Sequence, residues 1–341
     1  MRSIGYILAT NLSHEGILLK VQGQLTALQK RFNPNLCFIN YKNTDFFLIK
    51  VLTYFIFELK SLFFLIRYPL IYIRYNPKSV LLNILILFFS WIKPIYVEHN
   101  TLYSPELKFL NRKKELFLHK LTYFLYRISN ITHIGVNQEL CSHLKKIKLK
   151  HIVYAQNGYL CPADETTKEE TIILNQLTEF KKKFKFCAIF CGNGYAWHGV
   201  KDVISELNKF PEIGLVIVGP FTLPDEKNIL SIPFLESASL AKVIESCDFA
   251  ISTFRWDIIN ISEGSPLKSR QYLCHGCPMI INYYDSALDY KELTNYIIDF
   301  RQHSSESFNL ITKLNYSKST LKTIARKQLS WDVYFKTIFP N

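Results

Sequence analysis

Residues 261–281 read ISEGSPLKSRQYLCHGCPMII, and this stretch carries the start and stop signals of one helix together with the strand behind it. Ser265 and Pro266 are typical of a helix N-cap and a first helical residue. Gly276 is a helix stop, and an apolar run (277–282) follows it. The stretch therefore predicts a short helix that leads directly into a buried strand.

The same alternation of apolar runs and amphipathic helices extends over the whole chain. The predicted strands are 4–10, 35–40, 70–75, 94–99, 131–136, 151–156, 185–191, 214–219, 230–235, 248–253 and 277–282. Helices are expected between them, among others at 15–28, 199–209, 237–246 and 265–275. Strand–helix alternation that occurs twice predicts an α/β protein with two parallel-sheet domains, and the break falls between about residues 157 and 170.

Charge is distributed unevenly along the 341 residues, whose formal net charge is +13. Residues 1–158 hold 21 Lys and Arg against 7 Asp and Glu, a net +14, whereas residues 159–341 hold 20 against 21, a net −1. A basic first half suits nucleic acid, anionic lipid or a phosphorylated substrate. The longest charge-free apolar run (79–92) is too short to span a bilayer, and no signal peptide is visible, so we expect a cytoplasmic protein.

The eight cysteines show no disulfide-framework spacing and lie mostly in apolar runs, which fits a reducing compartment. Cys274 and Cys277 form a CxxC, and Cys187 and Cys191 form a second close pair. A zinc site would need all four to converge. The favoured interpretation is four core cysteines, and we expect no metal site.

Ligands of open parallel sheets bind beyond the carboxyl ends of the strands, where polar residues follow several predicted strands of this chain. In the opening stretch, the helix N-terminus and Lys268 favour an anion, and Glu263 and Gln271 could hold hydroxyl groups on either side of it. A diphosphate would fit there. An ordinary capped helix with solvated cations is an equally good interpretation of these residues alone.

A set of short segments follows a fixed order along the chain. They are EGILLKVQGQLTAL (15–28), IYIRY (71–75), VEHNT (97–101), AQNGY (155–159), IFCGNGYAWHGVKDVI (189–204), GLVIVG (214–219), the opening stretch, and SW (330–331). The set resembles the retaining GT-B glycosyltransferases of family 4 over nearly the whole chain. Glu263 and Gln271 stand at the two acids of that family's E-x7-E region, and SPLK.R.YL..G.P resembles a bacterial surface-polysaccharide branch.

The resemblance implies a GT-B fold, in which two Rossmann-like parallel-sheet domains face a cleft and a C-terminal helix crosses back to the first domain. We expect an acceptor-binding domain over 1–160, a nucleotide-sugar-binding domain over 161–322 and the returning helix over 323–341.

The implied activity is that of a retaining, metal-independent, hexosyltransferase-type glycosyltransferase. It would transfer a sugar from a nucleotide-sugar donor to a polyprenyl-linked glycan in capsule or O-antigen biosynthesis, at the inner face of the cell membrane. The nucleotide-sugar is a co-substrate, and no cofactor is implied.

The resemblance also assigns roles to residues. The catalytic candidates are His99, Glu263 and Lys268. The donor-binding candidates are Gly192, Asn193, His198, Gly264, Ser265, Pro266, Leu267, Arg270 and Gln271. The acceptor-side candidates are Gly16, Glu98 and Asn100.

Three positions depart from the family pattern. Gln271 replaces the second acid, and Asn193 and His198 replace an Arg and a Lys of the second domain's first loop. A neutral histidine binds a diphosphate more weakly, so Lys268 and Arg270 would carry more of the phosphate contact. These departures motivate a second hypothesis, a non-catalytic GT-B subunit that binds sugar nucleotide or glycan.

Residues 107–128 form a basic, aromatic, amphipathic stretch, LKFLNRKKELFLHKLTYFLYRI. Its apolar stripe comprises Leu107, Leu110, Phe117, Leu121, Phe124 and Ile128. The favoured interpretation is a core helix with a solvated basic face, and that face could also contact anionic lipid. Nucleic-acid binding is disfavoured, because no known motif is present and the aromatics lie in apolar runs.

Overall fold

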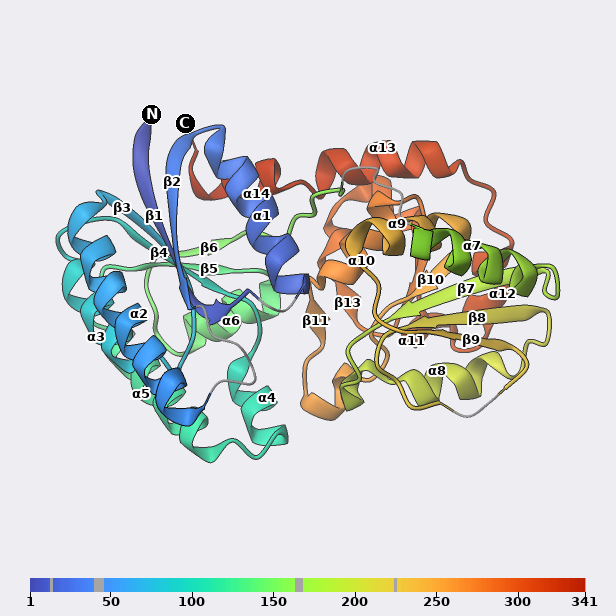
Figure 1. Ribbon diagram of the computed structural model, residues 1–341, viewed down its shortest axis with the longest axis horizontal. Coiled ribbons are helices and arrows are strands. Elements are labelled where there is room, and N and C mark those ends of the chain that lie inside the picture. The colour runs from blue at the N-terminus through green and yellow to red at the C-terminus, as the bar shows by residue number, and fades with distance from the viewer. Residues whose placement is uncertain (13–14, 40–45, 163–167, 224–225, 341) are drawn as a thin grey trace. The chain divides into compact units, whose positions relative to one another are not determined.

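A computed structural model describes residues 1–12, 15–39, 46–162, 168–223 and 226–340 (Figure 1). The chain forms two compact units. Unit 1 comprises Met1–Gly158 and Trp331–Asn341, and unit 2 comprises Tyr159–Ser330. Each is built on a six-stranded parallel sheet with helices packed on it, as the alternating sequence pattern predicted.

Unit 1 has the strand order β2-β1-β3-β4-β5-β6. Its strands are β1 (Arg2–Asn11), β2 (Phe32–Ile39), β3 (Leu70–Arg74), β4 (Ile95–His99), β5 (Thr132–Gly135) and β6 (Ile152–Tyr154). Its helices are α1 (Glu15–Gln29), α2 (Phe47–Arg67), α3 (Val80–Phe89), α4 (Tyr103–Phe109), α5 (Lys113–Tyr126), α6 (Gln138–Lys146) and α14 (Trp331–Ile338). Most of the sheet's apolar residues are fully buried, as in a parallel sheet covered on both faces.

Unit 2 has the strand order β14-β12-β10-β7-β8-β9. Its strands are β7 (Phe186–Cys191), β8 (Ile213–Val218), β9 (Ile229–Ile232), β10 (Phe249–Ile251), β12 (Met279–Ile281) and β14 (Ile297–Asp299), with a short separate pair, β11 (Glu263–Gly264) and β13 (Tyr284–Asp285). Its helices are α7 (Lys168–Lys181), η1 (Ala196–His198), α8 (Val200–Leu207), α9 (Ser237–Ser246), η2 (Trp256–Ile259), α10 (Leu267–Cys274), η3 (Ser286–Asp289), η4 (Lys291–Tyr296), α11 (Phe300–His303), α12 (Glu306–Thr312) and α13 (Lys318–Gln328).

The last helix, α14, belongs to unit 1 although it follows unit 2 in the chain. The hydroxyl groups of Tyr72 and Tyr334 are hydrogen-bonded at 2.7 Å, and the Arg31 guanidinium donates to the carbonyl of Phe339 at 2.8 Å. Lys20 of α1 lies over the Trp331 ring at 5.4 Å. The expected return of a C-terminal helix to the first domain is therefore confirmed.

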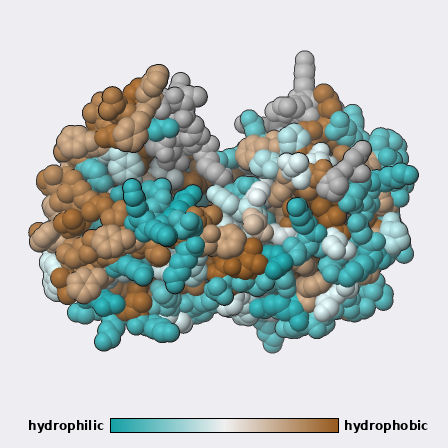
Figure 2. Space-filling view, turned by 90° about the horizontal axis from the view of Figure 1, so that it is seen from below, coloured by the Kyte–Doolittle hydropathy of each residue, from teal (hydrophilic) through white to brown (hydrophobic). Residues whose placement is uncertain are grey.

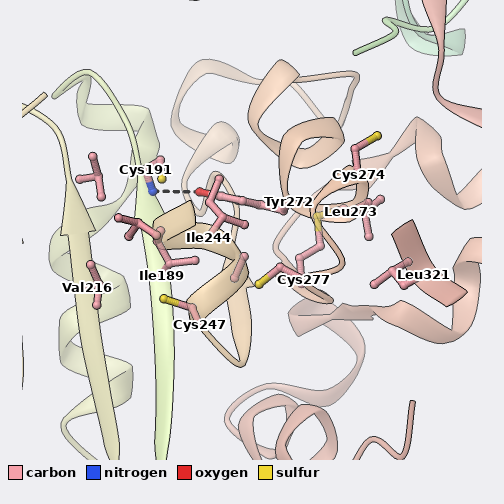
Figure 3. Close-up of a cluster of buried hydrophobic side chains, with 14 of the residues drawn as sticks. Ile189, Cys191, Val216, Ile244, Cys247, Tyr272, Leu273, Cys274, Cys277 and Leu321 are labelled. Carbon is pink, nitrogen blue, oxygen red and sulfur yellow. Dashed lines mark hydrogen bonds between the residues drawn. The ribbon is translucent and has the colours of Figure 1, made fainter. Parts of the chain in front are cut away.

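Most of the chain's cysteines lie in the apolar core of unit 2. Figure 3 shows Cys191, Cys247, Cys274 and Cys277 among buried apolar side chains of the sheet and its helices. The amide of Cys191 donates to the hydroxyl of Tyr272 at 2.8 Å. Within the described ranges, no three His, Cys, Asp or Glu side chains are grouped in a way that could hold a metal ion.

The favoured interpretation of residues 107–128, a core helix with a solvated basic face, is wrong for the part of the stretch after Asn111. The stretch forms two helices, α4 and α5, joined through Asn111 at a positive φ of 52°. Leu107 is buried, but Phe117 and Phe124 are 66% and 63% exposed. The apolar stripe of α5 faces outward, because its other face packs on the sheet through His119, Thr122, Tyr123 and Tyr126. No described helix is long and apolar enough to cross a bilayer.

Candidate functional site

The helix predicted from the opening stretch forms as α10, but it begins at Leu267 rather than at Ser265. Pro266 occupies the N-cap with extended backbone angles, and Ser265 is buried before it. The shift arises because β11, which pairs with β13, keeps the preceding residues extended. Glu263 and Gly264 lie on that short strand and are buried.

Gly264 has a packing reason to be glycine. A Cβ at this position would lie only 1.9 Å from the ring of Trp256. The Trp256 ring in turn packs on Tyr283 with a centroid distance of 4.3 Å. The backbone beside Glu263 is therefore held against an aromatic pair, which fixes where the Glu263 side chain begins.

Lys268 lies at the carboxyl end of β7. The residue as a whole is half-buried, but its Nζ donates to the carbonyl of Cys191 at 3.1 Å and lies 4.7 Å from the centre of the Phe190 ring. Desolvation lowers the pKa of Lys268 to about 7. An amino group in this setting gains much from an incoming anion, because no described carboxylate pairs with it.

Two of the predicted donor-binding residues, Gly192 and His198, lie beside Lys268. A Cβ on Gly192 would lie 2.6 Å from Nδ1 of His198, so the two residues are in contact and a larger residue would displace the imidazole. Burial, and then the charge of Lys268, lower the pKa of His198 to about 2, which keeps the imidazole neutral. Asn193 follows Gly192 in an exposed loop.

Two side chains at the site have unpaired polar atoms. Nδ1 of His198 and Nε2 of Gln271 are buried without a hydrogen-bond partner among the described residues. Gln271 lies beside Tyr159, but its amide nitrogen makes no bond of good geometry there. Such atoms are costly in a folded protein unless a ligand or water satisfies them. Both belong to the set predicted to bind the donor.

Arg270 does not lie with this group. Its guanidinium is fully buried and pairs with Asp285, and it donates to Oγ of Ser286 at 2.5 Å. The hydroxyl of Tyr283 also donates to Asp285, at 2.6 Å. The expected phosphate contact of Arg270 is thus replaced by an internal ion pair, because residue 270 lies two positions beyond Lys268 and points to another side of α10.

In unit 1, Glu98 is part of a buried polar network that the sequence did not reveal. Nζ of Lys20 lies 2.5 Å from Oε1 of Glu98 and donates to Asn157 at 2.7 Å and to Asn100. Burial would raise the pKa of Glu98, but the charges of Lys20 and Arg74 outweigh burial and lower it. Burial lowers the pKa of Lys20 to about 8 despite Glu98.

The signal for this network was present in α1. In the sequence, Leu18, Val21, Leu25 and Leu28 form one apolar stripe. The structure buries Val21 and Leu28 but leaves Leu18 and Leu25 half-exposed, and it buries Lys20 and Gln24 instead. Gln24 Nε2 lies 3.3 Å from Oε2 of Glu98 and 3.1 Å from the hydroxyl of Tyr72. The i, i+4 spacing of two polar residues pointed to this face.

His99 ends β4 and is fully buried. Its Nε2 is 3.0 Å from Nδ1 of His133, and the Tyr123 hydroxyl is 3.2 Å from its Nδ1. Burial, and then the neighbouring histidines, hold the pKa of His99 well below its ordinary value. Both ring nitrogens of His99 have partners inside unit 1. A direct role of His99 in catalysis stays a prediction. Gly16 is the second residue of α1, and its role also stays a prediction.

No protein-family model matches this sequence, and no curated protein has significant sequence similarity to it. Solved structures are similar in fold. The HepE protein of Anabaena in complex with UDP-glucose has a TM-score of 0.64 at 13% identity, covering 97% of this chain and 96% of that one. Sucrose-phosphate synthase from Thermosynechococcus elongatus has a TM-score of 0.63 at 11% identity, with coverages of 98% and 95%.

The similarity also extends to an enzyme of another reaction class. The UDP-GlcNAc 2-epimerase of Neisseria meningitidis, bound to UDP-GlcNAc, has a TM-score of 0.53 at 11% identity, with coverages of 99% and 100%. At these identities the likeness shows the fold. Two parallel α/β units, a returning C-terminal helix and full-length similarity to these structures establish that the chain has the GT-B fold.

Proposed function

We propose that this protein is a retaining, metal-independent glycosyltransferase of the hexosyltransferase type whose unit 2 binds a nucleotide-sugar donor. The observation that carries the proposal is the group at the carboxyl end of β7. There, the Lys268 amino group lies near the unpaired nitrogen of His198, and the unpaired amide nitrogen of Gln271 follows about one turn further along α10. Diphosphate oxygens accept from the amino group and ribose hydroxyl groups accept from the amide nitrogen, while the neutral imidazole nitrogen donates or accepts according to its tautomer. The HepE protein, of the same fold, is in complex with UDP-glucose.

Each residue then has a chemical task. Lys268 neutralises the diphosphate, which gains negative charge as the glycosidic bond to the nucleotide breaks. Glu263 accepts hydrogen bonds from the donor sugar's hydroxyl groups, and Gln271 holds the ribose. Gly192 and Gly264 are donor-side positions where a Cβ would contact His198 and the ring of Trp256 too closely. His198, Asn193, Ser265, Pro266 and Leu267 complete the proposed donor site.

The acceptor side belongs to unit 1 in this proposal. The buried ion pair between Lys20 and Glu98 holds Asn100 in place, and Nδ2 of Asn100 is buried without a partner among the described residues. An amide nitrogen in that condition suits an acceptor hydroxyl. We propose a polyprenyl-linked glycan of bacterial surface-polysaccharide synthesis as acceptor, with the protein bound at the inner face of the membrane.

The test begins with donor binding. UDP-, GDP-, ADP- and dTDP-sugars are screened by thermal shift, and the true donor raises the melting temperature. Glu263→Ala and Lys268→Ala then each lower kcat/KM, for transfer or donor hydrolysis, by roughly ten- to a thousandfold. Unchanged kinetics in both variants would refute the assignment of the site.

The non-catalytic subunit is the second candidate, because Gln271 and His198 stand where the family carries charged groups. It predicts a thermal shift with the donor but neither transfer nor hydrolysis. The product distinguishes a third outcome, since an epimerase of this fold would return an altered sugar nucleotide rather than a free nucleotide. NMR of the reaction mixture separates the three.

A further inference from the structure

Three neighbouring helices of unit 1, α2, α3 and α5, have large apolar side chains on their outer surface. The face of unit 1 seen in Figure 2 is largely brown, with teal side chains among the brown ones. We call the outward side chains of these helices the apolar face. A monomeric soluble protein rarely has a contiguous apolar surface of this extent.

Helix α2 shows most clearly that polar residues face inward and apolar residues face outward. Its inward residues include Glu58 and Ser61, which are buried. Its outward stripe, with side chains between 49% and 78% exposed, is made of Leu48, Leu52, Phe55, Leu59, Phe63 and Ile66. Spacings of three and four residues put these six on one side of the helix. A helix in contact with water has the opposite arrangement.

Helices α3 and α5 repeat the pattern. On α3, Asn83 is buried and accepts a hydrogen bond from the Tyr126 hydroxyl at 2.7 Å, whereas Phe88 and the following Trp91 are 63% and 64% exposed. On α5, His119 and Tyr123 are buried. Its outward stripe is Phe117, Leu121, Phe124 and the following Ile128.

The charges beside the apolar face have one sign. Residues 46–130 contain twelve Lys and Arg, four Glu and no Asp, and none of the four Glu is exposed. Lys113 and Lys120 of α5 and Arg127, which follows its last residue, recur every seven residues next to the outward stripe. The Arg127 guanidinium lies 5.8 Å from the centre of the Phe124 ring, and Arg67 lies 5.9 Å from that of Phe63.

The combination of apolar stripes and neighbouring cations indicates which kind of partner covers the apolar face. A second copy of the chain would bring the same cations against each other, which opposes self-association through this face. A bilayer surface with anionic headgroups offers acyl chains to the stripes and phosphates to the cations. Trp91, exposed beside Lys93, suits the headgroup level, where tryptophan is enriched.

We propose that the apolar face of α2, α3 and α5 inserts into the interface of an anionic bilayer, with its stripes among the upper acyl chains and its cations at the phosphates. The protein then lies in one leaflet without crossing it. This inference rests on the membrane setting of the proposed function, but not on sugar transfer.

Vesicle binding tests the inference, with phosphatidylcholine vesicles that do or do not contain phosphatidylglycerol. Phe117→Glu/Phe124→Glu is expected to weaken binding to the anionic vesicles at least about tenfold, since two large apolar groups no longer enter the lipid. The matched control is Ile172→Glu/Phe234→Glu in unit 2, whose side chains are 60% and 63% exposed, and it is expected to bind as the parent does.

A second pair of measurements separates insertion from adsorption. Lys113→Gln/Lys120→Gln/Arg127→Gln is expected to weaken binding about fivefold or less per charge removed, while the parent retains part of its binding at high salt. Lipids brominated in their acyl chains should quench tryptophan fluorescence of the bound protein, and Trp91→Phe should remove most of that quenching.

Three outcomes would overturn the proposal: unchanged binding of Phe117→Glu/Phe124→Glu, complete release of the parent by salt without quenching, or a parent dimer that the same substitutions convert to monomer. Circular dichroism and the nucleotide-sugar thermal shift are measured on every variant. A parent protein that shifts with donor but does not bind vesicles refutes insertion alone, whereas a parent that binds vesicles but no nucleotide-sugar refutes the proposed function alone.

Discussion

Lys268 is the residue whose ionisation matters most for the proposed reaction. Desolvation lowers its pKa to about 7, so the free protein loses this positive charge as the pH rises through neutrality. The protonated form binds a diphosphate, and binding therefore takes up a proton above pH 7. We expect donor affinity to fall by up to about tenfold per pH unit above 7.

Isothermal titration in buffers of different ionisation enthalpy measures both the affinity and the proton uptake. Lys268→Arg is the matched control, because its guanidinium stays charged and its donor affinity should not change between pH 7 and 9. Affinity of the parent that is constant over this range would show that the amino group does not contact the diphosphate.

Arg270 lies only two residues after Lys268, but we expect its substitution to change the stability of the fold rather than donor binding. Arg270→Met leaves Asp285 buried without its cation and is expected to cost about 3–5 kcal/mol of unfolding free energy. Arg270→Met/Asp285→Leu removes both charges and should recover part of that loss. Urea unfolding measures both variants. A stable Arg270→Met protein with weakened donor affinity would return Arg270 to the donor site.

At the scale of single elements, the sequence predicted the sheets better than the faces of the helices. Strands such as 214–219 are continuous apolar runs, which a parallel sheet requires, and they were located from the sequence. The strand β14 was missed because its three residues, Ile297–Asp299, contain only two apolar ones and end in an aspartate.

Helix faces were mispredicted where the apolar stripe does not mark the core. On α5 the stripe is outward, and on α1 the buried face contains Lys20 and Gln24. The residues of the proposed donor site could be predicted because they follow strand ends and a helix start. The network around Glu98 was not, since it joins α1 to residues about 80 and 137 positions away.

The histidines between α5 and the strands β4 and β5 predict acid sensitivity of unit 1. Burial lowers the pKa of His119 to about 4 and that of His133 to about 3, and the pKa of His99 is also well below its usual value. Below about pH 6.5 the unfolded chain binds protons that the folded chain excludes. Stability is therefore full above pH 6.5 and lost as the pH falls toward the folded pKa values.

Each such histidine should cost about 1.4 kcal/mol per pH unit in this window. Urea unfolding of the parent at pH 7, 6 and 5 measures the slope, and His119→Phe should reduce the slope by about 1.4 kcal/mol per pH unit. Equal stability at pH 7 and pH 5 would mean that these side chains are not buried and neutral. A free energy of unfolding that falls as the pH rises above 7 would also contradict the prediction, because buried neutral histidines require the opposite sign.

At the scale of the whole molecule, α14 is expected to contribute to the stability of unit 1 rather than of unit 2. Removing residues 331–341 exposes the ring of Tyr72 and deprives Lys20 of Trp331. Hydrogen exchange should then rise in β1, β3 and α1, whereas β7 and β8 stay protected. Faster exchange confined to unit 2 would show that α14 stabilises unit 2 and would contradict this prediction.

The chain leaves unit 1 at Gly158 and re-enters it at Trp331. In topological terms, unit 2 is an insertion within unit 1, and two covalent tethers join the units. During synthesis, domains usually mature from the N-terminus onward. Here the second unit has all of its residues while the first still lacks its last helix, so the order of completion is reversed. Until residues 331–341 have been synthesised, unit 1 lacks its last helix, and the surface that α14 covers is exposed to chaperones.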